Sequence, residues 1–223
     1  MRTLNYIAAF ALAALPATAP AQNAQDIIDR AATAYARLNS MKADFRQTLT
    51  NPLTGNTQTS TGQILRQKPN LLSITFNTGD RVAADGSTIW AYLPSSVPGQ
   101  VMKMPYKGAG VGSVDLADQF LNSPRARYNA TLAGTATISG RPTHAVTLVP
   151  KRQSSSFNRG KVWIDDADYS IRQIEVEGAN GLTRRVVITS FTANPYIARS
   201  AFRFSPPKGV KIVDQESLGG LAY

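Results

Sequence analysis

The first regular pattern of hydrophobic and polar positions in the chain predicts a helix over residues 23–41. Ile28, Ala31, Tyr35 and Leu38 recur at spacings of three or four residues, which places them on one face of a helix. The segment opens with an asparagine, a residue type that caps helix N-termini, and it carries an aspartate in its first turn. The sequence therefore predicts one amphipathic helix near the N-terminus.

After this helix the pattern changes to short runs in which polar and apolar residues alternate, as in strands with one buried face. Leu72, Ile74 and Phe76 share one side of such a run, and the Asp85-Gly86 pair is a strong hairpin signal. Strands separated by turns continue to the C-terminus, which predicts one large antiparallel sheet. The expected strands lie in ADFRQTL, TSTGQILRQ, KPNLLSITFN, RVAADGSTIWAYLP, RYNATLAG, TATISG, THAVTLVPK, KVWIDD, SIRQIEVEG and TRRVVITSFTAN.

The middle of the chain interrupts the strand pattern with a glycine-rich segment and a second helical stretch. The letters GAGVG lack the preceding strand and the spacing of a dinucleotide-binding loop, so we interpret them as a flexible hinge. In the stretch that follows, Val114, Ala117 and Leu121 share one helix face, with Leu116 and Phe120 beside them. This segment predicts a glycine-hinged helical insertion.

The segment FRFSPPKGVKI predicts a strand that stops, turns and restarts. Phe202 and Phe204 share a parity, as do Val210 and Ile212. The two prolines between these pairs deny further ladder hydrogen bonds, and the glycine allows a turn. We therefore expect a strand at Phe202–Phe204 and a further extended run after the turn.

The N-terminal letters MRTLNYIAAFALAALPATAPA predict a secretory signal peptide over residues 1–21. They combine a basic start at Arg2, a short apolar run and a small-residue cleavage site before Gln22. The alternative, an N-terminal membrane anchor, is disfavoured because the apolar run is too short to span a bilayer. We expect an exported, soluble mature chain that forms a single domain over residues 22–223.

Composition narrows the class of partners for such an exported chain. Lys and Arg number 24 against 14 Asp and Glu, a formal net charge of +10, which favours nucleic acid, membrane phosphates or acidic proteins as partners. Export argues against nucleic acid. Cysteine is absent, which excludes disulfides, thiol nucleophiles, cysteine metal sites and a lipid-modified cysteine on the mature chain.

Residue types suited to catalysis or metal binding are sparse. His144 is the single histidine, and it shares strand parity with Val146 and Leu148, which favours a packed or edge histidine. A Ser-His-Asp site would have to use it, and no Gly-x-Ser-x-Gly motif occurs. The acidic letters DDAD at 165–168 lack the wider pattern of a calcium loop and are interpreted as a solvated hairpin turn. We expect neither an enzyme nor a bound metal or cofactor.

Few helices are available to cover the predicted sheet, and two packing arrangements are therefore possible. One helix and one insertion must cover a sheet of about ten strands. The sheet can form a closed core, or it can curl and leave a concave face lined but unfilled, with side chains such as Leu72, Ile74, Phe76 and Trp90. A glycine-hinged apolar helix suits a mobile cover over a ligand cavity. Periodicity alone does not separate these arrangements.

Three segments carry a resemblance to a known family. KPNLLSI is similar to the family segment (K/R)-R-P-N-L-F-x-W, and DGSTIWAYLP is similar to S-D-G-x-x-L-W-x-Y-x-P. FRFSPPKGVKIVD is similar to the closing segment F-x-F-x-P-P-x-G-V. With the signal peptide, the first helix and the insertion, the likeness covers essentially the whole mature chain in order. The chain thus resembles the LolA family of periplasmic outer-membrane lipoprotein carriers.

The resemblance implies a mainly β (α+β) fold: an open, incomplete antiparallel β-barrel of about ten or eleven strands, with an N-terminal helix and a short helical lid over the concave apolar face. It implies a monomeric periplasmic carrier that shields lipoprotein acyl chains between the inner and outer membranes. An inner-membrane lipoprotein-releasing ABC transporter would supply the cargo, and in some bacteria an outer-membrane acceptor lipoprotein would receive it. The missing cysteine favours the soluble carrier over the lipidated acceptor of the same fold.

The resemblance also implies site residues. The family's lid-gating arginine falls on Lys68, a departure, because lysine lacks the planar donor fork of arginine. A family tryptophan is replaced by Ile74. The residues expected to line the acyl-chain cavity are Ile28, Tyr35, Phe45, Leu72, Ile74, Phe76, Trp90, Leu116, Phe120 and Leu121.

Three other functions stay open at this point. The same fold could carry a free lipid, a glycolipid or a small hydrophobic molecule. It could also act as a sensor or interaction module that detects mislocalised lipoproteins and regulates a partner. A hydrolase is disfavoured because catalytic groups are so few.

Overall fold

The computed structural model describes residues 23–106, 116–152 and 157–214 of the chain. The expected signal peptide, the GAGVG segment and Val114 lie outside the described residues. Within the described ranges the helices are α1 (Ala24–Arg37), α2 (Leu116–Leu121), α3 (Pro124–Arg127) and the 3-10 helix η2 (Arg199–Phe202).

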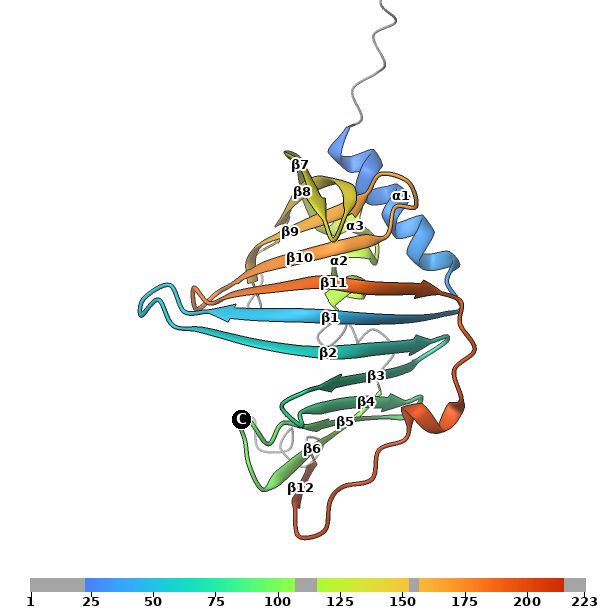
Figure 1. Cartoon of the computed structure of the whole chain (residues 1–223), viewed down its shortest axis with the longest axis vertical. Coiled ribbons are helices and arrows are strands. Elements are labelled where there is room, and N and C mark those ends of the chain that lie inside the picture. The colour runs from blue at the N-terminus through green and yellow to red at the C-terminus, as the bar shows by residue number, and fades with distance from the viewer. Residues whose placement is uncertain (1–22, 107–115, 153–156, 215–223) are drawn as a thin grey trace, which may run out of the picture.

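Twelve strands in these ranges belong to one sheet (Figure 1). They are β1 (Ser40–Thr50), β2 (Thr57–Gln67), β3 (Leu71–Phe76), β4 (Arg81–Asp85), β5 (Thr88–Tyr92), β6 (Gln100–Pro105), β7 (Tyr128–Ile138), β8 (Arg141–Pro150), β9 (Phe157–Asp165), β10 (Ile171–Gly178), β11 (Thr183–Ala193) and β12 (Lys211–Asp214).

The sheet is open. Its strand order is β12-β6-β5-β4-β3-β2-β1-β11-β10-β9-β8-β7, so β7 and β12 are edge strands that do not pair with each other among the described residues. Neighbours pair antiparallel except for β12, which runs parallel to β6. The predicted fold class, a mainly β chain with an open antiparallel sheet and an N-terminal helix, is confirmed. The sheet has twelve strands against the expected ten or eleven. Strand β6 was not among the expected runs, and RYNATLAG and TATISG, which were expected as separate strands, form the single strand β7.

The N-terminal helix forms as predicted but ends earlier. Its N-cap is Asn23, whose Oδ1 accepts a hydrogen bond from the Gln25 backbone N–H at 2.7 Å. Beyond the last turn, the backbone N–H groups of Asn39 and Ser40 donate to Oδ1 of Asn194, at 2.8 and 3.3 Å. These bonds hold the chain beside the end of β11. The prediction of helix up to residue 41 is therefore wrong at this end, because tertiary hydrogen bonds start β1 there.

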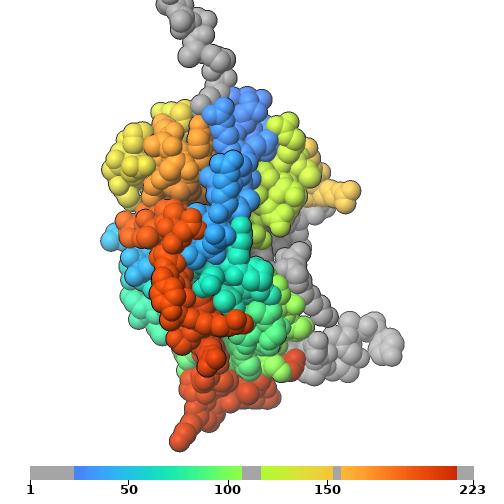
Figure 2. Space-filling view, turned by 90° about the vertical axis from the view of Figure 1, so that its right-hand side faces the viewer, coloured from blue at the N-terminus to red at the C-terminus, as the bar shows by residue number. Residues whose placement is uncertain are grey.

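The strand predicted at Phe202–Phe204 is wrong. Phe202 ends η2, and Phe204 stacks on Trp90 and Tyr92 of β5, with ring centroids 6.0 and 6.2 Å apart. The segment runs down the side of the molecule (red in Figure 2), and its helix η2 contacts β3 and β4, each of which already pairs with a strand on both sides. The predicted turn is present, with Gly209 at φ 81°, a left-handed conformation that favours glycine.

Two hydrophobic clusters cover the face of the sheet on which α1 lies. The first, here called the filled cluster, joins α1, α2 and strands β7–β10. The second, the central cluster, joins β1, β3, β4, β5 and β11. Figure 2 shows α1 (blue) lying between the β9–β10 region (orange) and the α2–α3 region (yellow-green). Because α1 lies mainly over the filled cluster, the two clusters are covered to different extents.

Candidate binding cavity

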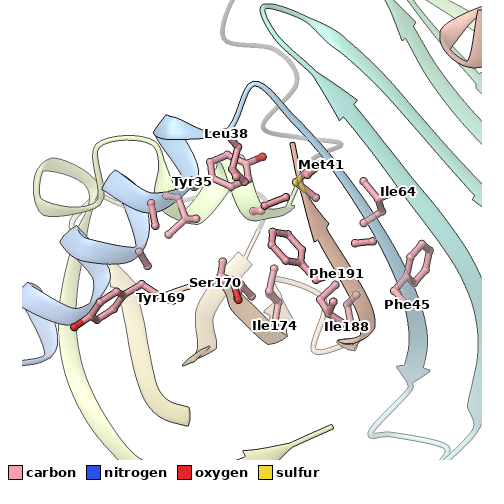
Figure 3. A pocket seen from close by; sticks show the side chains of 18 of the residues that line it. Tyr35, Leu38, Met41, Phe45, Ile64, Tyr169, Ser170, Ile174, Ile188 and Phe191 are labelled. Carbon is pink, nitrogen blue, oxygen red and sulfur yellow. The ribbon is translucent and has the colours of Figure 1, made fainter. Parts of the chain in front are cut away.

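A cavity of about 190 Å³ lies beneath α1, where the filled cluster meets the central cluster (Figure 3). This volume is far larger than the roughly 10–15 Å³ that a single water molecule needs. Its walls are predominantly apolar. The lining residues are Ala31, Ala34, Tyr35, Leu38, Met41, Ala43, Phe45, Ile64, Ile74, Ala117, Leu121, Asp168, Tyr169, Ser170, Ile171, Ile174, Arg184, Val186, Ile188, Phe191 and Ala193.

The cavity is built by elements that are far apart in the sequence. The second half of α1 places Tyr35 and Leu38 over it, while strands β1 and β11 form its floor (Figure 3). Every second residue of a strand faces the same side, which brings Phe45 and Ile188 to the cavity. α2 contributes from the remaining side. The cavity is thus a product of the curled sheet and two helices.

A glycine on β2 allows the floor to pack. Gly62 lies opposite Phe45, and a Cβ at this glycine would lie 2.6 Å from the Phe45 ring and 2.2 Å from the Thr75 carbonyl oxygen. The Phe45 ring therefore lies over the bare backbone of β2. There it meets the ring of Phe76 edge-on, with centroids 5.3 Å apart.

Four of the ten residues proposed from the sequence as cavity residues line this cavity. They are Tyr35 from α1, Phe45 from β1, Ile74 from β3 and Leu121 from α2. They come from four different elements, and the fold brings them together. The side chain of Leu116 lies outside the described residues. Whether these side chains bind a ligand stays a prediction.

The other five proposed residues lie elsewhere in the described structure. Ile28 and Phe120 are fully buried in the filled cluster, and Leu72 is buried in the central cluster, so these three are packed core positions. Phe76 packs at the border of the central cluster. Trp90 lies on the opposite face of the sheet, where it meets the C-terminal segment. Except at Trp90, sequence parity identified inward-facing positions, but it did not show which of them border empty space.

Phe120 is buried because its ring packs against Gly160 on β9, which has no side chain. A Cβ at Gly160 would lie 2.4 Å from the Phe120 ring, so only glycine leaves room for the ring on β9. Phe157 and Tyr128 surround the same ring, with centroids 5.4 and 5.8 Å away. These contacts make α2 a packed part of the filled cluster through Phe120, while Leu121 reaches the cavity.

The sequence reading missed the lining residues of β11 and of the β9–β10 turn. Val186 and Ile188 follow the strand alternation of TRRVVITSF and could have been found from it. Phe191 has the opposite parity, yet it also lines the cavity, because a bulge in the β1–β11 pairing shifts the register. Tyr169 and Ser170 lie in a turn, for which periodicity carries no signal.

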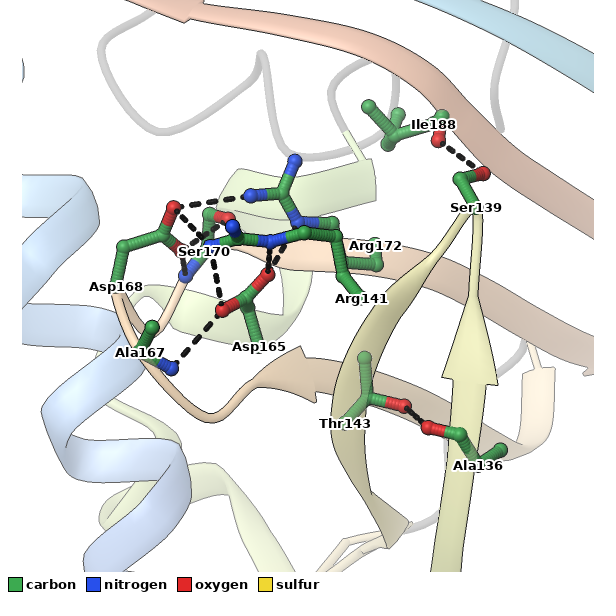
Figure 4. A network of polar contacts seen from close by, with 10 residues as sticks. All are labelled: Ala136, Ser139, Arg141, Thr143, Asp165, Ala167, Asp168, Ser170, Arg172 and Ile188. Carbon is green, nitrogen blue, oxygen red and sulfur yellow. Dashed lines mark hydrogen bonds and ion pairs between the residues drawn. The ribbon is translucent and has the colours of Figure 1, made fainter.

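The β9–β10 turn is held by a network of charged groups (Figure 4). Arg141 donates from Nε and Nη2 to the Asp165 carboxylate at 2.7 and 3.0 Å, and Arg172 donates from Nε at 2.8 Å. Arg172 also reaches Asp168 at 2.9 Å. The DDAD letters do form the predicted hairpin turn. The expectation that this turn is solvated is wrong for Asp165, whose side chain is only 1% exposed.

The network changes the acidity of Asp165. Burial by itself would raise the pKa of this carboxyl group. Hydrogen bonds from Arg141, the Ala167 backbone N–H and Arg172 outweigh burial and hold the pKa well below its ordinary range. Asp165 is therefore ionised under all physiological conditions, and it anchors the turn that borders the cavity.

Lys68 contacts α1. Its Nζ donates a hydrogen bond to the carbonyl oxygen of Ala36, in the last turn of the helix. A cation at this end also complements the helix dipole. The structure thus connects Lys68 to the helix over the cavity, while its expected role in gating a lid stays a prediction.

The single histidine, His144, is not among the described residues that line the cavity. His144 lies on β8, the strand next to the edge strand β7, with Nδ1 2.5 Å from an Asp166 carboxylate oxygen. No set of three or more His, Cys, Asp or Glu residues in the described ranges could hold a metal ion. Nor does any described helix combine the length and apolarity needed to cross a membrane.

The chain is similar to known carriers over most of its length. It is 26% identical over 184 residues to the outer-membrane lipoprotein carrier protein of Pasteurella multocida, covering 81% of this chain and 83% of that protein. It is 27% identical over 198 residues to the protein of the same name from Serratia proteamaculans, covering 87% and 89%.

Among solved structures, an uncharacterized conserved protein from Thermus thermophilus has a similar fold, with a TM-score of 0.54 at 13% identity, over 86% of this chain and 98% of that one. The model of the family described as outer membrane lipoprotein carrier protein LolA matches residues 36–205. This match spans the helix end, the cavity strands and the C-terminal segment, and the chain therefore belongs to the LolA family of outer membrane lipoprotein carrier proteins.

Proposed function

We propose that the chain is a periplasmic carrier that binds the acyl chains of lipoproteins in the cavity beneath α1 and ferries them from the inner to the outer membrane. The observation that carries this proposal is an apolar cavity between two hydrophobic clusters in a chain of the carrier family. The signal peptide predicted at residues 1–21 provides the route to the periplasm. The function requires binding and release but no covalent chemistry.

The cavity suits this task energetically. Each methylene removed from water contributes about 0.8 kcal/mol, so an acyl chain of about fifteen methylenes exposed to water would cost roughly 12 kcal/mol. A carrier must shield such a chain and must also release it. A cavity covered on one side by the second half of α1 meets both needs, because Tyr35 and Leu38 can move while the first half of the helix stays packed in the filled cluster.

The partners in this proposal follow from the route. An inner-membrane lipoprotein-releasing ABC transporter would load the carrier, and an outer-membrane acceptor lipoprotein could unload it. The net charge of +10 supports docking to anionic headgroups or to an acidic surface of such a partner. We expect a monomer that binds neither nucleic acid nor a cofactor.

The test is the identity of the molecules that co-purify with the mature chain from the periplasm, measured by native mass spectrometry. Acylated lipoproteins bound one to one are expected. Ala34 lines the cavity and Ala36 lies exposed on the same helix, which provides a matched pair of variants. Ala34→Glu places a charge against the apolar wall and should lose the cargo, whereas Ala36→Glu should keep it.

Three results would contradict the proposal. Glycerolipids without lipoproteins in the wild-type protein would indicate a carrier of another lipid. A protein that is empty but bound to a regulator would indicate a sensing module. Equal cargo in the two glutamate variants would show that the cavity is not the binding site.

A further inference from the structure

Arg184 is a cation in the wall of an otherwise predominantly apolar cavity. It lies on β11, on the same face as Val186 and Ile188, both of which are buried and line the cavity. The surrounding burial lowers the pKa of its guanidinium. Placing a charge in such an environment carries a desolvation cost, which calls for a partner.

The partner that Arg184 has is only a neutral one. Its Nε donates to Oε1 of Gln47, a buried side chain on β1, at 2.7 Å. No carboxylate pairs with Arg184 among the described residues, and its terminal nitrogens have no hydrogen-bond partner there. The neighbouring Arg185 differs, since it points to the opposite face and pairs with Glu175 at 2.8 Å.

The other polar side chains at the cavity have their partners within the protein. The Tyr169 hydroxyl accepts a hydrogen bond from Arg30 at 2.8 Å. The Ser170 hydroxyl donates to Asp168, which also accepts from Arg172. The free donors of Arg184 therefore stand out among the described lining residues as a site for an oxygen acceptor from a ligand.

We propose that Arg184 binds an ester carbonyl oxygen of the glycerol-linked acyl chains of the cargo, and this rests on the proposed carrier function. In an acylated molecule, the carbonyl oxygens are the first polar atoms that follow the hydrocarbon chain. A donor in the wall of an apolar cavity can thus meet these carbonyls, whereas a charged headgroup stays in water. Hydrogen bonds between a charged donor and a neutral acceptor are among the stronger ones in proteins.

The position of Arg184 also orients the cargo. Arg184 lies opposite Leu49, next to the end of β1 that leads into the β1–β2 hairpin. At the other end of the same strand pair, Met41 lies opposite Ala193, close to where α1 ends. The glycerol backbone therefore faces the hairpin end and the methyl ends of the acyl chains point toward α1. The polypeptide of a lipoprotein would leave the carrier at the hairpin end.

The test compares two versions of one probe on the purified mature chain. The first is a fluorescent lipopeptide with two palmitoyl ester chains on its S-glyceryl cysteine and an N-palmitoyl group. The second replaces the two ester carbonyls by methylenes. Arg184→Met should weaken binding of the ester probe about tenfold or more and leave the affinity for the ether probe unchanged, because the amide carbonyls are common to both probes and only the first carries ester carbonyls. Arg185→Met, on the opposite face, is the control and should change neither affinity.

Methionine keeps an apolar stem and removes the buried charge, so the variant is expected to fold. Arg184→Lys keeps the charge without the planar fork and provides a second variant, expected to show a smaller loss for the ester probe. Equal losses for ester and ether probes would overturn the assignment of Arg184.

The same pair of measurements with diester and diether phosphatidylglycerol separates the sources of the carbonyl. Suppose that the wild-type chain binds only the phospholipid and that Arg184→Met weakens binding of the diester form but not of the diether form. In that case the Arg184 contact stands and the lipoprotein function fails. If Arg184→Met weakens both phospholipid versions equally, the contact is with phosphate and the assignment fails. No binding of either probe by the wild-type chain would overturn both proposals.

Discussion

The filled cluster and the central cluster share one face of the sheet but are packed differently. In the filled cluster, the first half of α1 and the helix α2 lie on strands β7–β10, and the rings of Phe120, Tyr128 and Phe157 occupy the space between. In the central cluster the strands supply the buried residues, and α1 contributes only Tyr35 and Leu38 at its border. The cavity lies at the border where the filled cluster meets the central cluster.

The difference shows how one helix can serve two purposes. Ile27, Ile28 and Ala31 fix the first half of α1 in a closed core, with exposures of 0–2%. Tyr35 and Leu38, one and two turns later, are only partly buried and border the cavity. The helix is therefore anchored at one end and left with a cavity beneath the other.

Removing a ring from the filled cluster should have the largest effect. We expect Phe120→Ala to lower the free energy of unfolding by about 3–5 kcal/mol, because the ring is fully buried and leaves a void. Phe191→Ala, at the cavity wall, should cost about 1–2 kcal/mol, since one side of its ring already faces empty space. Chemical denaturation measures both. Similar losses in the two variants would show that the clusters are equally packed.

Disrupting the charged network beneath the first half of α1 should give the next largest loss of stability. Asp165→Asn is expected to cost about 3 kcal/mol, because it leaves Arg141 and Arg172, whose side chain is 12% exposed, without their shared carboxylate. The matched control Asp166→Asn, at a neighbouring carboxylate that is 39% exposed, should cost less than about 1 kcal/mol.

The same group predicts a pH dependence. The pKa of Asp165 is lower in the folded state than the unfolded value of about 3.9, so the unfolded chain binds the proton more readily. The stability that Asp165 provides is present above that value and is lost as the pH falls from about 5 toward acid. Denaturation curves at several pH values should show a shallower acid decline in Asp165→Asn than in the wild type. Parallel declines would argue against the network.

Filling the cavity should have a smaller effect of the opposite sign on stability. Ala34→Leu adds apolar volume at the cavity wall and should raise the free energy of unfolding by about 1 kcal/mol. It should also weaken binding of an acylated probe, because the ligand loses that space. Ala36→Leu, on the exposed side of α1, should change neither quantity. A stabilised variant that still binds normally would place the ligand elsewhere.

Removing the contact of Lys68 with α1 should have the smallest effect on stability. Lys68→Met removes the hydrogen bond to the Ala36 carbonyl and the favourable charge at the helix C-terminus, at a cost of about 0.5 kcal/mol, because the side chain is exposed. Hydrogen exchange should report faster opening of the last turn of α1 and no change in the filled cluster. Lys42→Met, on an exposed position of β1, is the control. Opening of the whole helix would mean that Lys68 holds more than its last turn.

Much of the fold could be predicted from local patterns. The cap at Asn23, the Asp85-Gly86 hairpin and the alternation of Leu72, Ile74 and Phe76 all correspond to elements of the structure. The failures share one cause. Phe202–Phe204 alternates like a strand, but the strands beside it, β3 to β5, already pair on both sides, and the Phe204 ring lies against Trp90 and Tyr92 of β5. A pattern records which side a residue favours, and tertiary pairing decides what it meets there.

The candidate site was less predictable than the fold. Tyr35, Phe45, Ile74 and Leu121 were chosen as inward-facing positions and do line the cavity, but so were Ile28 and Phe120, which are packed core. Two details that local patterns do not reveal decided whether a ring is packed in the core or lines the cavity. Gly160 admits the Phe120 ring, and the bulge beside Asp44 turns Phe191 inward.

The sequence by itself determined most of the elements, the family and the exclusion of cysteine chemistry, because these depend on residue types and local spacing. Only the tertiary structure decided where the cavity lies, that Asp165 is buried, and that Arg184 faces apolar walls with its terminal donors unused among the described residues. The physical reason is that empty space is a property of several elements together. Each strand or helix determines which of its own side chains face inward, and a cavity forms only where the side chains of several elements together do not fill the space between them.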